Sequence, residues 1–321
     1  MKLTIIDPSK KKEKDSKSIQ FEKVGSRDER YSTRVWKRFR RHPGAMVGSI
    51  IFFLLLLSVM LAPLSPYDPD KSDVGESLQA PTWQHWMGTD ALGRDLLTRV
   101  LYGGRISLTV GLMVVAITLI IGISMGVIAG YVGGIVENIL MRITDAALTL
   151  PSLLVLILLS AILREVELPI FHRNSVITIA VVIGLLSWMT FARLVRAACL
   201  TIREMEFVTA SRSLGASHIR LILRHILPNI VGPIIVESTL ELGYAIIEES
   251  GLSFLGFGIQ PPTPSWGNLL SNAQENFLKH PWLAIFPGLM IFITIISVNY
   301  IGDGLRDALD PHKFLGKLGE G

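Results

Sequence analysis

Four glutamates lie in or directly after one apolar run, where ionisable side chains are uncommon. Glu237 and Glu241 lie four residues apart in the apolar run 229–248, and Glu248 and Glu249 follow it. An ionised side chain at mid-bilayer costs about 2.5–3.5 kcal/mol on insertion scales, so such side chains normally face protein or water. We expect Glu237 and Glu241 to line a polar translocation path that favours cationic or zwitterionic cargo. The alternative is that they pair with arginines or with a sister subunit, or carry a proton.

Sequence patterns for catalysis do not accompany these glutamates. The chain lacks the phosphate-binding loop G-x-x-x-x-G-K-[ST] and the zinc-protease pattern H-E-x-x-H. Of its seven histidines only His218 and His225 are near each other, and Cys199 is the single cysteine. A zinc site needs several such ligands, and a disulfide needs two cysteines. We therefore expect no catalytic, cofactor or metal site in this chain.

Long apolar runs are the elements that must position the glutamates. Half of the 321 residues are apolar, the mean hydropathy is +0.46 and only 18% of the residues are charged. Soluble domains usually carry about a quarter charged residues, whereas apolar runs of roughly 18 or more residues are typical of membrane-spanning helices. The sequence predicts an all-α integral membrane protein with six transmembrane helices, at 44–64, 107–130, 139–163, 175–192, 229–248 and 283–302.

The distribution of charge predicts how these helices are oriented. Residues 1–42 hold 14 Lys and Arg against six Asp and Glu, whereas the rest of the chain holds 17 against 21. A basic block beside a first span stays in the cytoplasm, so six spans place both termini there. The predicted parts are a cytoplasmic basic tail with an amphipathic interfacial helix at 1–43, a first transmembrane helix at 44–64, an extracytoplasmic loop at 65–106, a transmembrane core at 107–302 with a cytoplasmic loop at 193–228, and a cytoplasmic tail at 303–321.

The stretch STRVWKRFRRH, directly before the first span, has the pattern of a surface helix. Val35, Trp36 and Phe39 can share one side of a helix that is basic elsewhere. That pattern suits a helix at the membrane surface, with rings buried and cations near anionic lipid. A basic flank that merely fixes topology is the alternative. We expect the lipid bilayer, and not nucleic acid, as the partner of this tail.

Glycines and a proline predict how the spans pack. Gly122, Gly126 and Gly130 recur at four-residue spacing, which gives a smooth stripe where another helix can approach closely. Pro151 should kink the third span. Arg142 and Asp145 lie three residues apart on one helical face, so we expect them to pair.

The segment between the fourth and fifth runs has the pattern of two amphipathic helices. Glycine favours the left-handed end of a helix, so we expect Gly215 to end the first helix and Ser217 to cap the second. Arg220 and Arg224 form a basic face, and Pro228 interrupts the pattern. The segment should present an apolar seam to a docking partner. Apolar or small residues recur at i, i+3, i+4 and i+7 in each half: Phe207, Ala210, Ser211 and Leu214, then Ile219, Ile222, Leu223 and Ile226.

This segment resembles the cytoplasmic EAA loop of ABC-importer permeases. That motif is Glu-Ala-Ala, three residues, Gly, nine residues, then Ile-x-Leu-Pro. Gly215 matches, as do Leu227 and Pro228, whereas His225 holds the first Ile place. The EAA places hold Thr209, Ala210 and Ser211, so Thr209 replaces the acidic residue. The resemblance implies that the loop contains a coupling helix, which enters a cleft on an ATPase subunit.

Three further stretches narrow the resemblance to one family. They are GTDALGRDLLTRVLYGGRISL at 88–108, ESGLSFLGFGIQPPTPSWGNLL at 249–270 and IGDGLRDALDP at 301–311. The chain resembles the C-type permease of dipeptide/oligopeptide importers, the peptide/nickel family, from about Trp36 to Pro311. This implies a type I ABC importer permease fold, a bacterial cell-membrane location and di- or oligopeptide cargo. It also implies a homologous second permease, two cytoplasmic ABC ATPases that bind ATP and magnesium, and an extracytoplasmic substrate-binding protein.

Two of these stretches hold polar and aromatic residues that are expected on the outer side. They form a docking surface or outer gate, or else well-packed turns in which Asp90 is a cap and Arg94 and Asp95 pair locally. We favour the structural interpretation. The residues are Asp90, Arg94, Asp95, Gln260 and Trp266.

Alternative cargos and mechanisms remain open at this point. An importer of the same family that carries nickel or opines would share these signatures. A stand-alone proton-coupled transporter would use Glu237 and Glu241 as a proton relay, although the basic cytoplasmic loop argues against it. A membrane enzyme is a third alternative, but the sequence shows no catalytic constellation that would support it.

Overall fold

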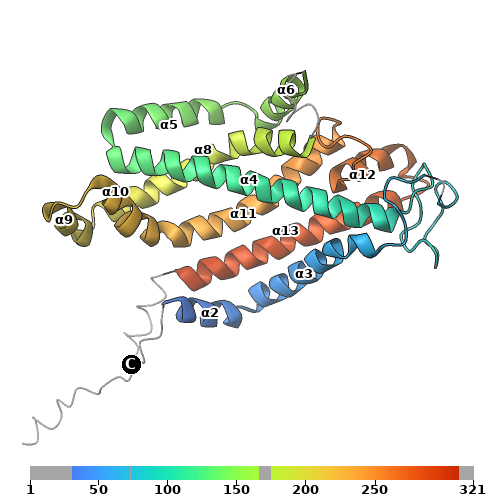
Figure 1. Cartoon of the computed structure of the whole chain (residues 1–321), viewed down its shortest axis with the longest axis horizontal. Coiled ribbons are helices and arrows are strands. Elements are labelled where there is room, and N and C mark those ends of the chain that lie inside the picture. The colour runs from blue at the N-terminus through green and yellow to red at the C-terminus, as the bar shows by residue number, and fades with distance from the viewer. Residues whose placement is uncertain (1–30, 73, 166–174, 311–321) are drawn as a thin grey trace, which may run out of the picture.

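Long helices form a bundle in the computed structural model, which describes residues 31–72, 74–165 and 175–310 (Figure 1). The parts of the predicted tails at 1–30 and 311–321, residue 73 of the predicted outer loop and residues 166–174 lie outside the described residues. Among the described residues, five helices are long and apolar enough to cross a membrane. These are α3 (Pro43–Met60), α4 (Leu96–Val132), α8 (Ser175–Arg203), the stretch His218–Phe254 that ends in α11 (Leu227–Phe254), and α13 (Trp282–Leu309).

The third predicted span is a bent pair of helices. α5 (Gly134–Leu148) and α6 (Ser152–Glu165) meet at 92°. Pro151 lies in the break, because proline disfavours a helical conformation at the residue before it and cannot donate a backbone hydrogen bond. The predicted kink is confirmed, and the predicted span 139–163 is divided between the two helices. Asp145 pairs with Arg193 of α8 and not with Arg142.

Several helices extend past their apolar runs. α4 starts at Leu96 and α8 continues to Arg203, so the predicted loops 65–106 and 193–228 are partly helical. α13 runs to Leu309, so Asp303 lies inside this helix and does not cap a separate one. An apolar run marks the part of a helix that crosses the hydrocarbon, whereas the helix itself continues wherever one side stays packed, as Gly302 and Ala308 do.

The bundle has two distinct ends, which Figure 1 shows on opposite sides. The end that carries α9 and α10 is called the α9 end here, and the opposite end, with the loop 65–95 and α12, is called the α12 end. α2 packs beside the α9-end portions of α3 and α13. The shorter elements are α2 (Tyr31–Arg41), η1 (Ala62–Leu64), α9 (Glu206–Ser213), α10 (His218–Leu221), η2 (Ile222–Ile226), α12 (Trp266–Ala273) and η3 (Gln274–Asn276).

The glycine stripe of α4 lies directly against α8. A Cβ at Gly126 would lie 2.6 Å from Val195 Cβ and 2.7 Å from the Ala192 oxygen. A Cβ at Gly130 would lie 2.8 Å from Cys199 Cβ. The predicted close approach of two helices is confirmed, and Cys199 is a buried packing residue.

We predict that Gly126→Ala lowers the stability of the fold, because the added methyl group has no room against α8. Overpacking of this kind typically costs about 1–3 kcal/mol. Gly251→Ala in α11 is the matched control, since a Cβ there would meet nothing within 4 Å. Thermal unfolding in detergent should show a lower Tm for the first variant alone. Equal Tm values for both variants would contradict the packing argument.

Candidate functional site

The turn between α9 and α10 is fixed by backbone hydrogen bonds. Gly215 has φ of +82°, a conformation that residues with a Cβ rarely adopt. Its N–H donates to the Arg212 oxygen at 3.0 Å, and the Ala216 N–H donates to the Ser211 oxygen at 3.1 Å. These are the two bonds of a Schellman helix end. Ser217 Oγ accepts the Arg220 N–H at 3.4 Å, so the predicted glycine stop and serine cap are both confirmed.

Pro228 changes the helix without ending it. Proline cannot donate to the oxygen four residues earlier, and its ring crowds that oxygen. The five residues of η2 form a π-turn, in which the Leu227 N–H donates to the Ile222 oxygen. The Asn229 side chain donates to the His225 oxygen at 2.6 Å. The second helix of the loop therefore continues into α11, and the expected interruption at Pro228 is a wide turn.

Four apolar side chains stand exposed around this turn. The exposed fractions are 43% for Phe207, 89% for Leu214, 70% for Ile219 and 61% for Leu223. We call these four residues the tip patch. Arg220 and Arg224 are also exposed. Such large apolar side chains without cover in one place are typical of a docking surface.

The predicted seam is not one continuous face. Ile222 packs inward, and Ile226 is fully buried, in one hydrophobic cluster with Cys199 and Ile230. The π-turn is the physical reason, because it holds more residues per turn than an α-helix and shifts the helical period between Leu223 and Leu227. Sequence spacing alone placed both residues with the exposed ones.

Hydrogen bonds fasten the tip to the neighbouring helices. Arg203, at the end of α8, donates to the oxygens of Gly130 and Tyr131 at 3.0 and 3.1 Å. The Tyr131 hydroxyl lies 2.6 Å from Nδ1 of His218 in α10. Arg196 of α8 pairs with Glu137 of α5. These contacts join α8 and α10 to α4, and α8 to α5.

The residues at the EAA places face solvent. Thr209 and Ala210 are exposed and Ser211 is half-buried. The Ser211 hydroxyl donates to the Phe207 oxygen at 2.8 Å within α9. The helix therefore forms without the carboxylate that the motif usually carries. Val208, directly before Thr209, is buried and anchors α9 to the bundle.

A cavity of about 480 Å³ lies between the α5–α6 bend, α8 and α11. Glu237 and Glu241 both line it, together with Tyr244 and Glu248. One oxygen of Glu241, Oε1, is buried without a hydrogen-bond partner among the described residues. These four side chains recur at i, i+4, i+7 and i+11 of α11, so they share one face. The sequence therefore carried a signal for Glu248 that its position near the end of the apolar run obscured.

Glu249 has a different environment from its neighbour Glu248. Its side chain is fully buried, and its carboxylate accepts hydrogen bonds from the hydroxyls of Ser107 at 2.9 Å and Ser253 at 2.7 Å. The Ser107 oxygen also accepts the Trp266 N–H at 3.2 Å. This network joins α4, α11 and the start of α12. Consecutive residues of a helix point about 100° apart, so one glutamate lines the cavity and the next holds the helices together.

The motif GTDALGRD forms a tightly bonded turn at the α12 end. Asp90 accepts the Arg94 N–H at 3.0 Å and pairs with the Arg94 side chain at 2.7 Å. Asp95 caps α4 by accepting the Thr98 N–H at 2.8 Å, and it lies 2.8 Å from Nδ1 of His85. These contacts fit the favoured structural interpretation, although Asp95, and not Asp90, is the residue that caps a helix.

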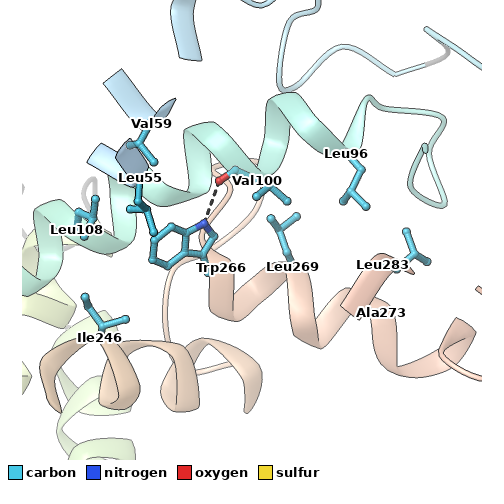
Figure 2. Close-up of a cluster of buried hydrophobic side chains, with 10 residues drawn as sticks. All are labelled: Leu55, Val59, Leu96, Val100, Leu108, Ile246, Trp266, Leu269, Ala273 and Leu283. Atoms are coloured by element: carbon cyan, nitrogen blue, oxygen red, sulfur yellow. Dashed lines mark hydrogen bonds between the residues drawn. The ribbon is translucent and has the colours of Figure 1, made fainter. Parts of the chain in front are cut away.

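Trp266 lies in the core and not on the outer surface. Figure 2 shows its indole N–H donating to the Val100 oxygen at 2.9 Å, among side chains such as Leu96, Leu108 and Ile246. Asp95 is also buried. The burial of Trp266 and Asp95 argues against the docking-surface alternative for these two residues and fits the favoured structural interpretation.

Gln260 is the exposed member of the predicted outer residues, whereas Asp90 and Arg94 are largely buried. Asp90 and Arg94 line a cavity of about 530 Å³ together with residues of α12 and η3. Gln260 is exposed and donates to the Gly258 oxygen at 3.0 Å. Their role in docking stays a prediction.

Neither a metal-ligand cluster nor a hydrolase-type turn is formed by the described residues. Within the described ranges, no group of three or more His, Cys, Asp or Glu lies together in a way that could hold a metal ion. The letters of Gly122–Gly126 match the hydrolase pattern G-x-S-x-G, which in hydrolases lies on a strand-to-helix turn. Here they lie inside α4, and the Ser124 hydroxyl donates to the Ile120 oxygen at 2.6 Å.

Two family models match the chain. Residues 122–314 match the model described as binding-protein-dependent transport system inner membrane component. Residues 31–81 match the model of the N-terminal TM domain of oligopeptide transport permease C. The first model covers more than half of the sequence and includes both the tip and the cavity.

Whole-chain relatives and solved structures agree with these matches. A Brucella suis protein named as a peptide permease is 41% identical to this chain, over 85% of this chain and 89% of the Brucella protein. The glutathione transport system permease protein GsiD of Escherichia coli is 41% identical over 86% and 89%. The fold is similar to that in structures of the MetNI methionine ABC transporter in inward-facing conformations, with a TM-score of 0.53, 17% identity and coverage of 66% and 96%. An amino acid ABC transporter gives a TM-score of 0.50, 16% identity and coverage of 65% and 92%.

Proposed function

Because the chain belongs to the binding-protein-dependent transport system inner membrane components, and is thus the non-catalytic permease subunit of an ABC importer, we propose that its cargo is peptide. The relatives described above, named for peptide and for glutathione, support this cargo over nickel or opines. Their ABC permease identity argues against the stand-alone proton-coupled alternative. The protein lies in the inner membrane.

The proposed docking surface for an ABC ATPase is the tip patch. Its four exposed apolar side chains on a rigid turn are the observation that carries the proposal. Burial of such side chains drives association, and Arg220 and Arg224 would orient the partner. In this proposal two ATPases, which bind ATP and magnesium, lie in the cytoplasm, so the α9 end and both termini face the cytoplasm. The basic residues of α8 and the tip support that orientation.

The proposed assembly places two further proteins around the chain. A homologous second permease would close the cavity on its open side and complete the pathway. A substrate-binding protein would meet the α12 end, where Gln260 is exposed and Asp90 and Arg94 line a cavity. The described residues bound the cavity by the α5–α6 bend, α8 and α11 and leave it partly open, which supports a pathway shared between two chains.

Mechanical coupling follows from the course of two helices. α8 and α11 both start or end at the tip and both line the cavity. When the ATPases close on ATP, they would move the tip, and the two helices would carry that movement to Ser187, Thr190 and Glu241 at the cavity wall. The chain would thus act as a lever with two states and do no bond chemistry.

The glutamates of the cavity would favour the ammonium group of a peptide. Glu237, Glu241 and Glu248 bring three carboxylates to one wall, and the buried Glu241 Oε1 lacks a partner among the described residues. A cation placed there would supply the missing donor. A charge-assisted hydrogen bond of this kind is worth about 1.5–3 kcal/mol.

Glu237→Gln combined with Glu241→Gln tests this path. Uptake of a free peptide by the reconstituted transporter should fall by roughly 10- to 100-fold at low substrate concentration. Uptake of the same peptide with an acetylated amino group should change little. Glu76→Gln with Glu165→Gln is the matched control, since both side chains are exposed and lie outside the cavity. Unchanged kinetics for both peptides would remove the two glutamates from the path.

A further inference from the structure

α2 carries a surface that neither the tip nor the cavity uses. The helix contains no acidic residue in its first turn and three arginines in its last turn. Phe39 is buried in a small cluster with Ala45 and Ala308, so the helix is docked on the α9-end portions of α3 and α13. Trp36 stacks on Phe39 with ring centroids 5.9 Å apart, yet 57% of it is exposed. A large aromatic ring beside a docked one is thus left facing away from the protein.

The position of α2 along the membrane follows from α3. Only His42 separates α2 from α3. α3 has 18 residues, almost all apolar, and its large side chains Ile50, Phe53 and Leu54 are exposed and require hydrocarbon. At about 1.5 Å per residue these 18 residues match the thickness of the hydrocarbon core, which is roughly 30 Å. α2 must therefore lie where hydrocarbon gives way to headgroups.

Three arginines of α2 are exposed on the same helix as this ring. Arg34, Arg40 and Arg41 are all exposed. Tryptophan prefers the interface between hydrocarbon and water, and arginine forms paired hydrogen bonds with phosphate. We propose that α2 binds anionic phospholipid, with Trp36 among the upper acyl chains and these arginines on the headgroups. Because Phe39 docks α2 on α13, a lipid bound by α2 would lie beside the end of α13.

A basic flank that fixes topology would need the charges but not the rest of the arrangement. Such a flank requires neither a docked Phe39 nor an exposed ring at headgroup depth. The proposal requires both, and it holds on either side of the membrane. It is also independent of the ATPase and of the cargo, so its failure would leave the proposed function untouched.

Brominated lipids test the proposal on the full-length protein in nanodiscs. The bilayer is two parts phosphatidylcholine to one part phosphatidylglycerol, and bromine is placed on the acyl chains of one lipid or the other. The fluorescence lost in Trp36→Phe isolates the signal of Trp36 from that of the other tryptophans. Quenching of that signal per mole fraction should be at least about three-fold greater when phosphatidylglycerol carries the bromine. This ratio should fall towards one in about 1 M salt, where screening is nearly complete.

Three variants decide the result. Combined substitution of Arg34, Arg40 and Arg41 by Gln should lower the ratio to about one, whereas their substitution by Lys should keep it high. The matched control replaces Arg212, Arg220 and Arg224 by Gln, which removes three exposed charges from the tip, and the ratio should not change. A ratio near one in the unmodified protein would overturn the proposal and favour a protein partner or no partner. An equal decrease in the control would also overturn it.

Discussion

Gly215→Pro is expected to abolish ATP-driven uptake while the protein still reaches the membrane. Proline fixes φ near −65°, whereas Gly215 has φ of +82°. The substitution also removes the N–H that donates to the Arg212 oxygen. The backbone where α9 meets the turn would have to change conformation, at a cost of about 3 kcal/mol or more. The tip patch would then lose its shape. The spans lie elsewhere, so insertion should continue.

Gly215→Asn is the matched control for this experiment. Asparagine adopts the left-handed conformation more readily than most residues. A Cβ at this position would meet nothing within 4 Å, so the larger side chain has room. Uptake should be measured against the amount of protein in the membrane fraction, and the asparagine variant should stay within about three-fold of the unmodified protein. Normal uptake by the proline variant would refute the role of the turn.

Replacing Leu214, Ile219 and Leu223 by serine should remove the binding of the ATPase subunits. Burying one such side chain is worth about 1.5–3 kcal/mol, so the loss of three should weaken the complex by roughly 1,000-fold or more. The permease would be immobilised in nanodiscs and titrated with its ATPase. Uptake should fall in parallel, because without a docked ATPase no movement reaches α8 and α11.

An identical chemical change at the other end supplies the control. Leu64, Leu92 and Leu278 are large, exposed and remote from the tip. Their replacement by serine removes the same apolar area and leaves the proposed docking surface intact. ATPase affinity should be unchanged in this variant. If both triple variants bind the ATPase equally well, the tip patch is not the docking surface.

Local rules predicted the tip well. Gly215 and Ser217 act through backbone bonds to residues within five positions, so their roles are legible in the sequence. Ile222 and Ile226 were misplaced, because the period of a helix holds only while the helix is regular. The sequence contained Pro228, which causes the irregularity, but the choice between a break and a π-turn depends on side chains such as Asn229.

Residues at the α12 end illustrate the opposite case. Asp95 and Trp266 belong to chemical types that often mark surfaces, and nothing adjacent in sequence indicates their burial. Their partners are distant: His85 for Asp95, and the Val100 oxygen for Trp266. Glu249 depends in the same way on Ser107, 142 positions earlier in the chain. Contacts of this range are set by how helices pack, which no local pattern specifies.

The π-turn of η2 also determines an angle. Each residue of a regular α-helix accounts for about 100° of rotation and 1.5 Å of rise. The wide turn at 222–226 stands between the helix face that bears Ile219 and Leu223 and the face that bears Glu237 and Glu241. The number of residues within that turn therefore sets the angle, about the helix axis, between the proposed docking surface and the cavity. No single side chain sets it. A relative that lacked one of these residues could keep both surfaces intact and still have them out of phase.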